Sequence, residues 1–385
     1  LDLSRVLAGP WCTQTLADLG ADVIKIERPG SGDDTRSWGP PFLKDADGKD
    51  SAESAYYLGT NRNKRSVTCD IAQPAGQALV RDLVLHCDVF VENFKVGDMA
   101  RYGLDFDSLR QLNPKLVYCS VTGFGQTGPY RERAGYDYAV QGMGGLMSVT
   151  GERDDLGGGP QKVGVAVADL FTGLYATVAI LAAVRHAERT GQGQHVDMAL
   201  LDTQVAMLAN LGANYLVSGK APGRAGNAHQ NIVPYQVFEV APAADGSKDH
   251  LILAVGNDSQ FAKFCAVAGR PELARPEILA EVKARMAALA DTRFAAATEA
   301  GISGAAEANE HLSNLFAEAA ECNRLVVERE ADTQFLDPVQ HLRGMFRILH
   351  HQRLGEFELQ RSGHDRRARQ HGAQILDQVL TQQLP

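Results

Sequence analysis

The chain has 385 residues, 44% of them hydrophobic and 22% charged, a composition typical of a globular protein with material for two or three domains. A formal net charge of -9 argues against a general nucleic-acid binder, although 38 lysines and arginines can still form local phosphate-binding patches. The six cysteines show no CxxC spacing, which favours free thiols in a reducing, cytoplasmic environment and gives no metal motif. The longest apolar stretch, 170–184, is shorter than the roughly 20 residues of a membrane span, so we expect a buried helix and no membrane segment.

Short β-branched runs alternate with helical periods over the first 200 residues, and even the first few residues predict a strand. The expected strands cover 22–27, 65–70, 88–92, 116–121 and 195–199. The expected helices cover 74–86, 168–190 and 200–218. Strands separated by helices of this length are typical of parallel β-α-β units, so we predict an α/β fold with a Rossmann-like parallel sheet and helices on both faces.

The composition of the sequence and its pattern of predicted elements change after residue 218. Residues 219–226 have the glycine and proline content of a linker, 250–255 predicts a strand, and 257–330 is rich in alanine and glutamate and predicts helices. A short strand at 356–359 and a helix at 373–383 follow. We therefore predict a large α/β domain over 1–218, a linker and smaller α+β domain over 219–335, and a separate C-terminal segment over 336–385.

Asp169 lies between a Gly/Ala/Val run and the apolar helix that follows, so it belongs at or near a helix N-terminus. The more common interpretation of such an aspartate is a capping residue that accepts hydrogen bonds from free N–H groups. The alternative is a carboxylate in apolar surroundings that acts as a nucleophile. Position alone does not decide between them.

Several basic residues follow predicted strands. Arg28 follows 22–27, Lys64 starts the run into 65–70, and Arg101 follows 88–92. Loops at the carboxyl ends of parallel strands converge on one crevice, so these cations could together bind a polyphosphate, whereas each taken singly is more simply a solvated charge. Neither glycine cluster (142–145 and 157–159) forms a GxGxxG or Walker loop, which argues against nicotinamide and ATP chemistry. The late histidines lack metal-ligand spacing, so no metal is expected.

An ordered series of short motifs runs through the first 268 residues. They include 19–29 (LGADVIKIERP), 63–66 (NKRS), 88–94 (DVFVENF), 123–129 (GFGQTGP), 134–137 (AGYD), 169–173 (DLFTG) and 226–229 (GNAH). In this order the set closely resembles the class III CoA-transferase (CaiB/BaiF) family, although residues 269–330 and 366–374 depart from its pattern. The resemblance implies that Asp169 attacks an acyl-CoA thioester, forming a mixed anhydride and then an aspartyl-CoA thioester. CoA and acyl-CoA are then substrates, with no permanent cofactor.

The resemblance also carries over binding positions. The implied CoA-lining residues are Arg28, Asn61, Lys64, Asn93, Phe94, Arg101, Tyr136 and Asp137. Leu7 stands where the oxalate-using transferase has a glutamine, which argues against an oxalate site. The stretches 33–42 and 229–238, the latter beginning at His229, resemble transferases that exchange CoA between succinate and glutarate-type dicarboxylates. A dicarboxylate needs a cation for its distal carboxylate, and Arg5 or Arg36 is the candidate.

Racemases of the same family use a histidine in a Gly-His-Asp triplet, where this chain has Tyr136. An unperturbed tyrosine pKa is near 10 against about 6.5 for histidine, so Tyr136 is a poor base at neutral pH and transfer is favoured over racemisation. A CoA-binding protein without catalysis is a further alternative. Family members form interlocked homodimers, and the resemblance implies the same here, with the C-terminal segment 336–385 returning to the large domain.

Overall fold

The computed structural model describes residues 1–240, 242, 246–278 and 280. Its strands are β1 (Val23–Glu27), β2 (Phe42–Lys44), β3 (Asp50–Ser54), β4 (Lys64–Thr68), β5 (Val89–Glu92), β6 (Val117–Thr122), β7 (His195–Ala199), β8 (Tyr235–Val240) and β9 (Asp249–Ala254). Its first helices are α1 (Ala8–Asp18), α2 (Ala55–Asn61), α3 (Pro74–Val84), α4 (Asp98–Arg101), α5 (Phe106–Leu112) and α6 (Asp137–Met143). They are followed by α7 (Leu146–Val149), α8 (Val167–Thr190), α9 (Leu200–Met207), α10 (Ala209–Ser218) and α11 (Asp258–Val267).

The central sheet is parallel and is completed by a single residue near the start of the chain. β1 pairs with β4, and β6 lies between β5 and β7, all in parallel. Asp2 bridges these two groups, because it pairs in parallel with both Lys25 of β1 and Val91 of β5. The resulting order, β4–β1–Asp2–β5–β6–β7, is that of a doubly wound Rossmann-type sheet. The predicted fold class is confirmed, and the strand expected in the first residues is reduced to one bridging position.

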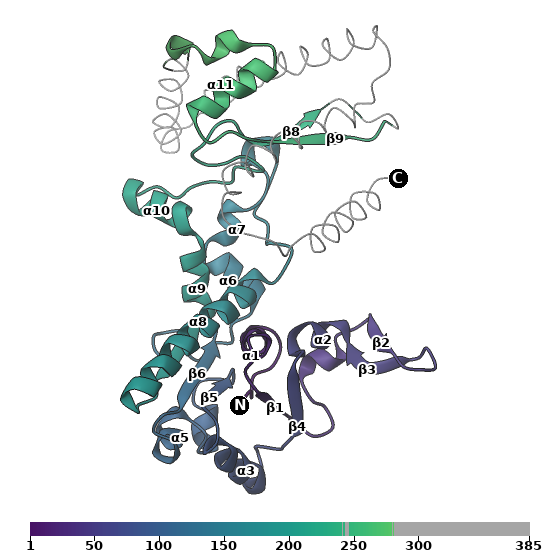
Figure 1. The fold of residues 1–385 in the computed structure, drawn as a ribbon, viewed down its shortest axis with the longest axis vertical. Coiled ribbons are helices and arrows are strands. Elements are labelled where there is room, and N and C mark those ends of the chain that lie inside the picture. The colour runs from purple at the N-terminus through teal and green to yellow at the C-terminus, as the bar shows by residue number, and fades with distance from the viewer. Residues whose placement is uncertain (241, 243–245, 279, 281–385) are drawn as a thin grey trace, which may run out of the picture. The chain divides into compact units, whose positions relative to one another are not determined.

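Helices cover both faces of this sheet (Figure 1). On one face, α1 and α8 pack over β5, β6 and β7 in a core that includes Cys12, Val91, Cys119 and Ile180. On the other face, α3 and α5 enclose a second core of side chains from β1, β5 and β6. Strand residues alternate between the two cores because successive side chains of a strand point to opposite faces.

The predicted strands and the helices at 74–86 and 168–190 are confirmed to within a few residues. α8 ends at Thr190, where Gly191 adopts the left-handed conformation expected of a C-terminal cap. The single helix predicted for 200–218 is wrong, because Ala209 has a φ of 45° and separates α9 from α10. No glycine or proline marks this break in the sequence.

α8 is long and apolar enough to cross a membrane by length and composition alone. Eight of its residues, among them Ala168, Thr172, Ala176 and Ile180, are buried. They face α1, β6, β7 and α9, so one side of α8 belongs to the core as predicted, whereas its outer side is exposed.

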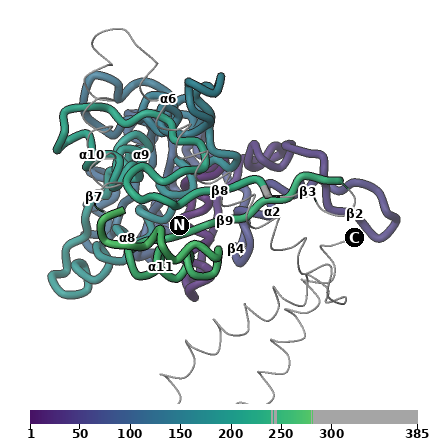
Figure 2. Tube along the Cα trace, turned by 90° about the horizontal axis from the view of Figure 1, so that it is seen from above, coloured from purple at the N-terminus to yellow at the C-terminus, as the bar shows by residue number. Residues whose placement is uncertain are grey.

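After α10, residues 219–234 contain no helix or strand, as expected for a linker. β8 and β9 then form an antiparallel hairpin in which Tyr235 pairs with Ala254 (Figure 2). The predicted strand at 250–255 is β9, and α11 begins the predicted helical stretch. The rest of that stretch, the strand at 356–359, the helix at 373–383 and the C-terminal segment 336–385 lie outside the described residues, and the domain boundaries stay predictions.

Candidate functional site

The strand order of the sheet reverses between Asp2 and β5, and ligands of doubly wound folds bind beyond the strand ends at such a point. The segments that leave the sheet here are joined by reciprocal hydrogen bonds. The Arg5 N–H donates to Asn93 Oδ1 (2.9 Å), and Asn93 Nδ2 donates to the Arg5 carbonyl (2.7 Å). The Arg5 guanidinium also lies 5.3 Å from the centre of the Phe94 ring. Three residues predicted separately, Arg5, Asn93 and Phe94, therefore form one cluster.

The turn into α1 is strained. Val6 has a φ of 73°, a conformation that β-branched residues rarely adopt, and its N–H donates to the buried Asp33 carboxylate (3.3 Å). Leu7, the residue before α1, is buried. Strain of this kind persists only where surrounding contacts fix it, which is common at functional sites. Leu7 thus has a fixed position beside the switch point.

Asp169 lies in the first turn of α8, as the sequence indicated. It is half-buried, and burial, with a contribution from the Asp137 charge, raises its carboxyl pKa from 3.8 to about 7. The capping role is taken by Asp137 instead, whose Oδ1 accepts hydrogen bonds from the N–H groups of Ala168 (2.8 Å) and Asp169 (3.4 Å). Burial and the second carboxylate thus oppose any lowering of the Asp169 pKa by the N-terminus of α8.

Two glycines allow Asp137 to reach α8. Gly123, just after β6, and Gly135, just before α6, lie backbone against backbone, and a Cβ on either would overlap the other residue. The chain before α6 is therefore held against the end of the sheet. This contact explains the glycine in the AGYD motif: it places Asp137 over the start of α8.

Tyr56 was not among the predicted site residues. It is half-buried in α2, and burial together with the negative charges of Asp169 and Asp137 raises its pKa to about 12. Its ring meets Trp38 edge-on, with centroids 5.2 Å apart. Tyr56 thus brings a neutral hydroxyl-bearing ring near Asp169. The sequence offered one signal for Tyr56, its position shortly before the predicted CoA-lining residues Asn61 and Lys64.

The predicted cations differ sharply in exposure. Arg28 is exposed just after β1, and Arg101, also exposed, is paired with Asp98. Lys64 is buried, and its Nζ donates to Asp2 (3.1 Å), the Pro10 carbonyl (2.9 Å) and Asn61 Oδ1 (2.9 Å). Burial lowers the pKa of Lys64. Lys64 and Asn61 thus brace the interior of the fold here, and their predicted contact with CoA stays a prediction.

The remaining predicted residues are spread more widely. The Arg36 guanidinium is held by Glu27 (2.7 Å) and Glu53 (2.6 Å) and lies over the Tyr57 ring at 3.8 Å. His229 Nδ1 accepts hydrogen bonds from the N–H groups of residues 231 and 232, which fixes a turn of the linker. Tyr136 precedes α6 and is 72% exposed. Of the two candidate arginines, Arg36 is already neutralised, whereas Arg5 is half exposed with one ion pair, to Asp34.

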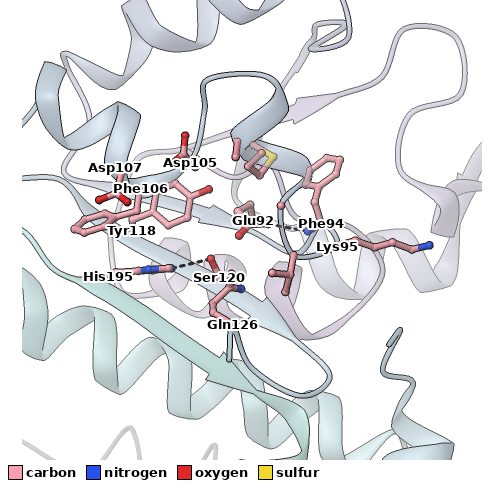
Figure 3. A pocket seen from close by; sticks show the side chains of 14 residues that line it. Glu92, Phe94, Lys95, Asp105, Phe106, Asp107, Tyr118, Ser120, Gln126 and His195 are labelled. Atoms are coloured by element: carbon pink, nitrogen blue, oxygen red, sulfur yellow. Dashed lines mark hydrogen bonds between the residues drawn. The ribbon is translucent and has the colours of Figure 1, made fainter. Parts of the chain in front are cut away.

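A cavity of about 250 Å³ lies behind the loop that follows β5 (Figure 3). Its lining includes Glu92, Phe94, Ser120 and His195, but not Asp169. Burial raises the pKa of Glu92 to about 7, and its carboxyl group accepts the Phe94 N–H (2.7 Å). Ser120 Oγ lies 2.9 Å from His195 Nε2. These hydrogen-bonded polar side chains of the cavity hold the loop that carries Asn93 and Phe94.

Among the described residues, no group of three or more His, Cys, Asp or Glu side chains could hold a metal ion. The groups near Asp169 are instead the Asp137 carboxylate that caps α8, the Tyr56 side chain, and the N-termini of α6 and α8. Such an arrangement can activate a carboxylate for attack on an acyl group, because burial removes the hydration that weakens a nucleophile.

The model of CoA-transferase family III matches residues 1–373 of this chain. The succinate–glutarate CoA-transferase of Agrobacterium fabrum is 59% identical over 299 residues, which are 78% of this chain and 72% of that protein. The succinyl-CoA:glutarate CoA-transferase of Homo sapiens is 47% identical over 273 residues, 71% of this chain but only 59% of that protein. A crystal structure of a CAIB/BAIF family protein from Brucella suis has a TM-score of 0.62 at 50% identity, covering 83% of this chain and 79% of the other.

Proposed function

The chain belongs to CoA-transferase family III, and we propose that it moves CoA from succinyl-CoA to a glutarate-type dicarboxylate with Asp169 as the covalent nucleophile. The observation that carries this proposal is the setting of Asp169. Its side chain is half-buried in the first turn of α8, while Asp137 takes the hydrogen bonds that a capping aspartate would accept. A carboxylate relieved of capping is available for chemistry.

The reaction follows from this arrangement. The ionised Asp169 attacks the thioester carbonyl, the C–S bond breaks, and a mixed anhydride and CoA thiolate form. The thiolate attacks the aspartyl carbonyl, which gives an aspartyl-CoA thioester and releases the donor acid. The acceptor carboxylate then attacks this thioester, and thiolate return to the new anhydride yields the new acyl-CoA and free Asp169. Each intermediate retains the activation of the original thioester as long as water is excluded.

Arg5 is our candidate for binding the distal carboxylate of a dicarboxylate. Its guanidinium is half exposed at the switch point, whereas Arg36 already bonds to Glu27 and Glu53. Arg5 can exchange its surface ion pair with Asp34 for a substrate carboxylate at small cost, because exposed ion pairs contribute little. Arg28 and Arg101, both exposed, are the candidate partners for CoA phosphates.

We also propose that two copies of the chain associate. The outer face of α8 exposes Phe171, Leu174, Val178 and Leu181, spaced as one helical stripe, and Val178 is 66% exposed. An exposed stripe of this length marks an interaction surface. A second copy is the occupant that fits the interlocked dimer implied by the family resemblance. A cytoplasmic location is proposed with it, supported by free thiols at Cys12, Cys69, Cys87 and Cys119.

The test is incubation with succinyl-CoA and glutarate, with glutaryl-CoA measured by mass spectrometry. Wild type is expected to form glutaryl-CoA, Asp169→Ala to form none, and hydroxylamine to trap Asp169 as a hydroxamate during turnover. Full activity of Asp169→Ala would refute the covalent role. The racemase alternative predicts exchange of the α-hydrogen of an acyl-CoA with D₂O, and a binding protein without catalysis predicts neither product.

A further inference from the structure

Gln141 is a fully buried side chain one helical turn after Asp137 on α6. Its Nε2 donates to Asp137 Oδ2 (2.7 Å), and its Oε1 accepts the N–H of Val163 (2.9 Å). The orientation of the amide is determined by its partners, because a carboxylate can only accept and a backbone N–H can only donate. Gln141 therefore connects two segments with a single defined geometry.

Both of those segments lead to the nucleophile. Asp137 uses its other oxygen, Oδ1, to accept the N–H groups of Ala168 and Asp169. Val163 begins the short stretch that enters α8. The amide of Gln141 thus holds the cap of α8 from one side and the approach to α8 from the other. Movement of either would displace the Asp169 carboxylate.

We infer that Gln141 is a positioning residue for the CoA-transfer reaction, aligning Asp169 through Asp137 and Val163 without contact with substrate. This inference rests on the proposed function for its kinetic consequence. A misplacement of about 1 Å at a reacting group can reduce turnover about 100-fold. The donated hydrogen bond also fixes the position of the Asp137 carboxylate beside Asp169, on which its charge acts.

Gln141→Leu keeps the approximate volume and removes both hydrogen bonds. We expect kcat for glutaryl-CoA formation to fall about 10- to 100-fold, with KM for succinyl-CoA changed less than about threefold, because alignment acts on the reacting atoms. Gln204→Leu is the matched control: Gln204 is also fully buried, on α9, and neither polar atom of its amide has a hydrogen-bond partner. Its kcat should stay within about twofold of wild type.

Gln141→Glu separates alignment from packing. A protonated glutamic acid still has one donor and one acceptor, so it can replace the amide, and burial beside Asp137 favours that form. The ratio of its kcat to that of wild type should be near one at pH 6 and fall as the pH rises to 9, at temperatures where both proteins stay folded. A constant ratio, or a Gln141→Leu kcat within threefold of wild type, would overturn the inference.

A second readout needs no activity. In wild type, the stability gained by Asp169→Asn should grow between pH 4 and 7, where Asp169 is ionised in the unfolded chain but still binds a proton in the folded protein. In the Gln141→Leu background this growth should be smaller and should stop at a lower pH, because an Asp137 carboxylate no longer held by Gln141 can move away from Asp169, so that its charge raises the pKa of Asp169 less. An unchanged pH dependence argues against Gln141 even if wild type transfers no CoA, so the two proposals fail separately.

Discussion

Replacing the proposed nucleophile by its neutral isostere should stabilise the protein while abolishing turnover. Asp169→Asn removes a carboxyl group whose pKa rises from 3.8 to about 7 on folding. A carboxyl with a raised pKa binds a proton more tightly in the folded state. Wild type therefore loses stability as pH rises from 4 through 7, and the amide variant escapes this loss.

The size of the effect follows from the shift. A shift of roughly three units corresponds to about 4 kcal/mol at 1.36 kcal/mol per unit, which is an upper bound for a half-buried group that water partly screens. We expect Asp169→Asn to exceed wild type by about 2–4 kcal/mol at pH 8 and by nearly nothing at pH 4. Between these limits the gap should widen by at most about 1.4 kcal/mol per pH unit.

Urea unfolding of both full-length proteins, followed by tryptophan fluorescence and circular dichroism at pH 4, 5, 6, 7 and 8, measures this gap. Only the pH dependence of this stability difference reports on the pKa of Asp169, because a difference that is the same at every pH would reflect packing of the amide. A gap equal at pH 5 and pH 8 would refute the assignment of a raised pKa to Asp169. A gap that narrows as the pH rises would mean that folding lowers the pKa of Asp169 instead of raising it.

Three further changes test other parts of the structure. Asp137→Asn should shift the acid limb of kcat/KM to lower pH by less than about 1.5 units, because the Asp137 charge is the smaller of the two causes of a roughly three-unit shift; an acid limb at unchanged pH would contradict this. Gly135→Ala should cost at least about 2 kcal/mol in urea unfolding, since its Cβ would overlap the Gly123 backbone, whereas Gly59→Ala has open space and should be nearly neutral. Val178→Lys should shift the mass measured by light scattering from dimer towards monomer, and an unchanged dimer would exclude the α8 stripe as the interface.

The strand pattern of the first 200 residues predicted the sheet well because β-branched runs and helical periods reflect burial directly. The prediction was weakest where structure depends on tertiary contacts. The break between α9 and α10 at Ala209 has no local signal. The bridging role of Asp2 depends on β1 and β5 lying on either side of it, which no short window of sequence can reveal.

The same limit applies to the site. Sequence motifs located Asp169 and the Arg5, Asn93 and Phe94 segments that the fold brings together. They could not show that Lys64 donates three hydrogen bonds to internal oxygens, because two of these oxygens, on Asp2 and Pro10, lie more than fifty residues away in the chain and reach Lys64 only in the finished fold. Gln141 carried one overlooked signal, its place four residues after Asp137 on the same helix face.

α8 carries both the proposed nucleophile and the proposed dimer surface. Its first turn bears Asp169, and its exposed stripe begins two residues later at Phe171. If a second copy covers that stripe, subunit association and acyl-CoA binding beside Asp169 share a single free-energy cycle, so each alters the affinity of the other by the same factor. Specific activity would then depend on enzyme concentration, falling on dilution below the dissociation constant and recovering when the protein is concentrated again.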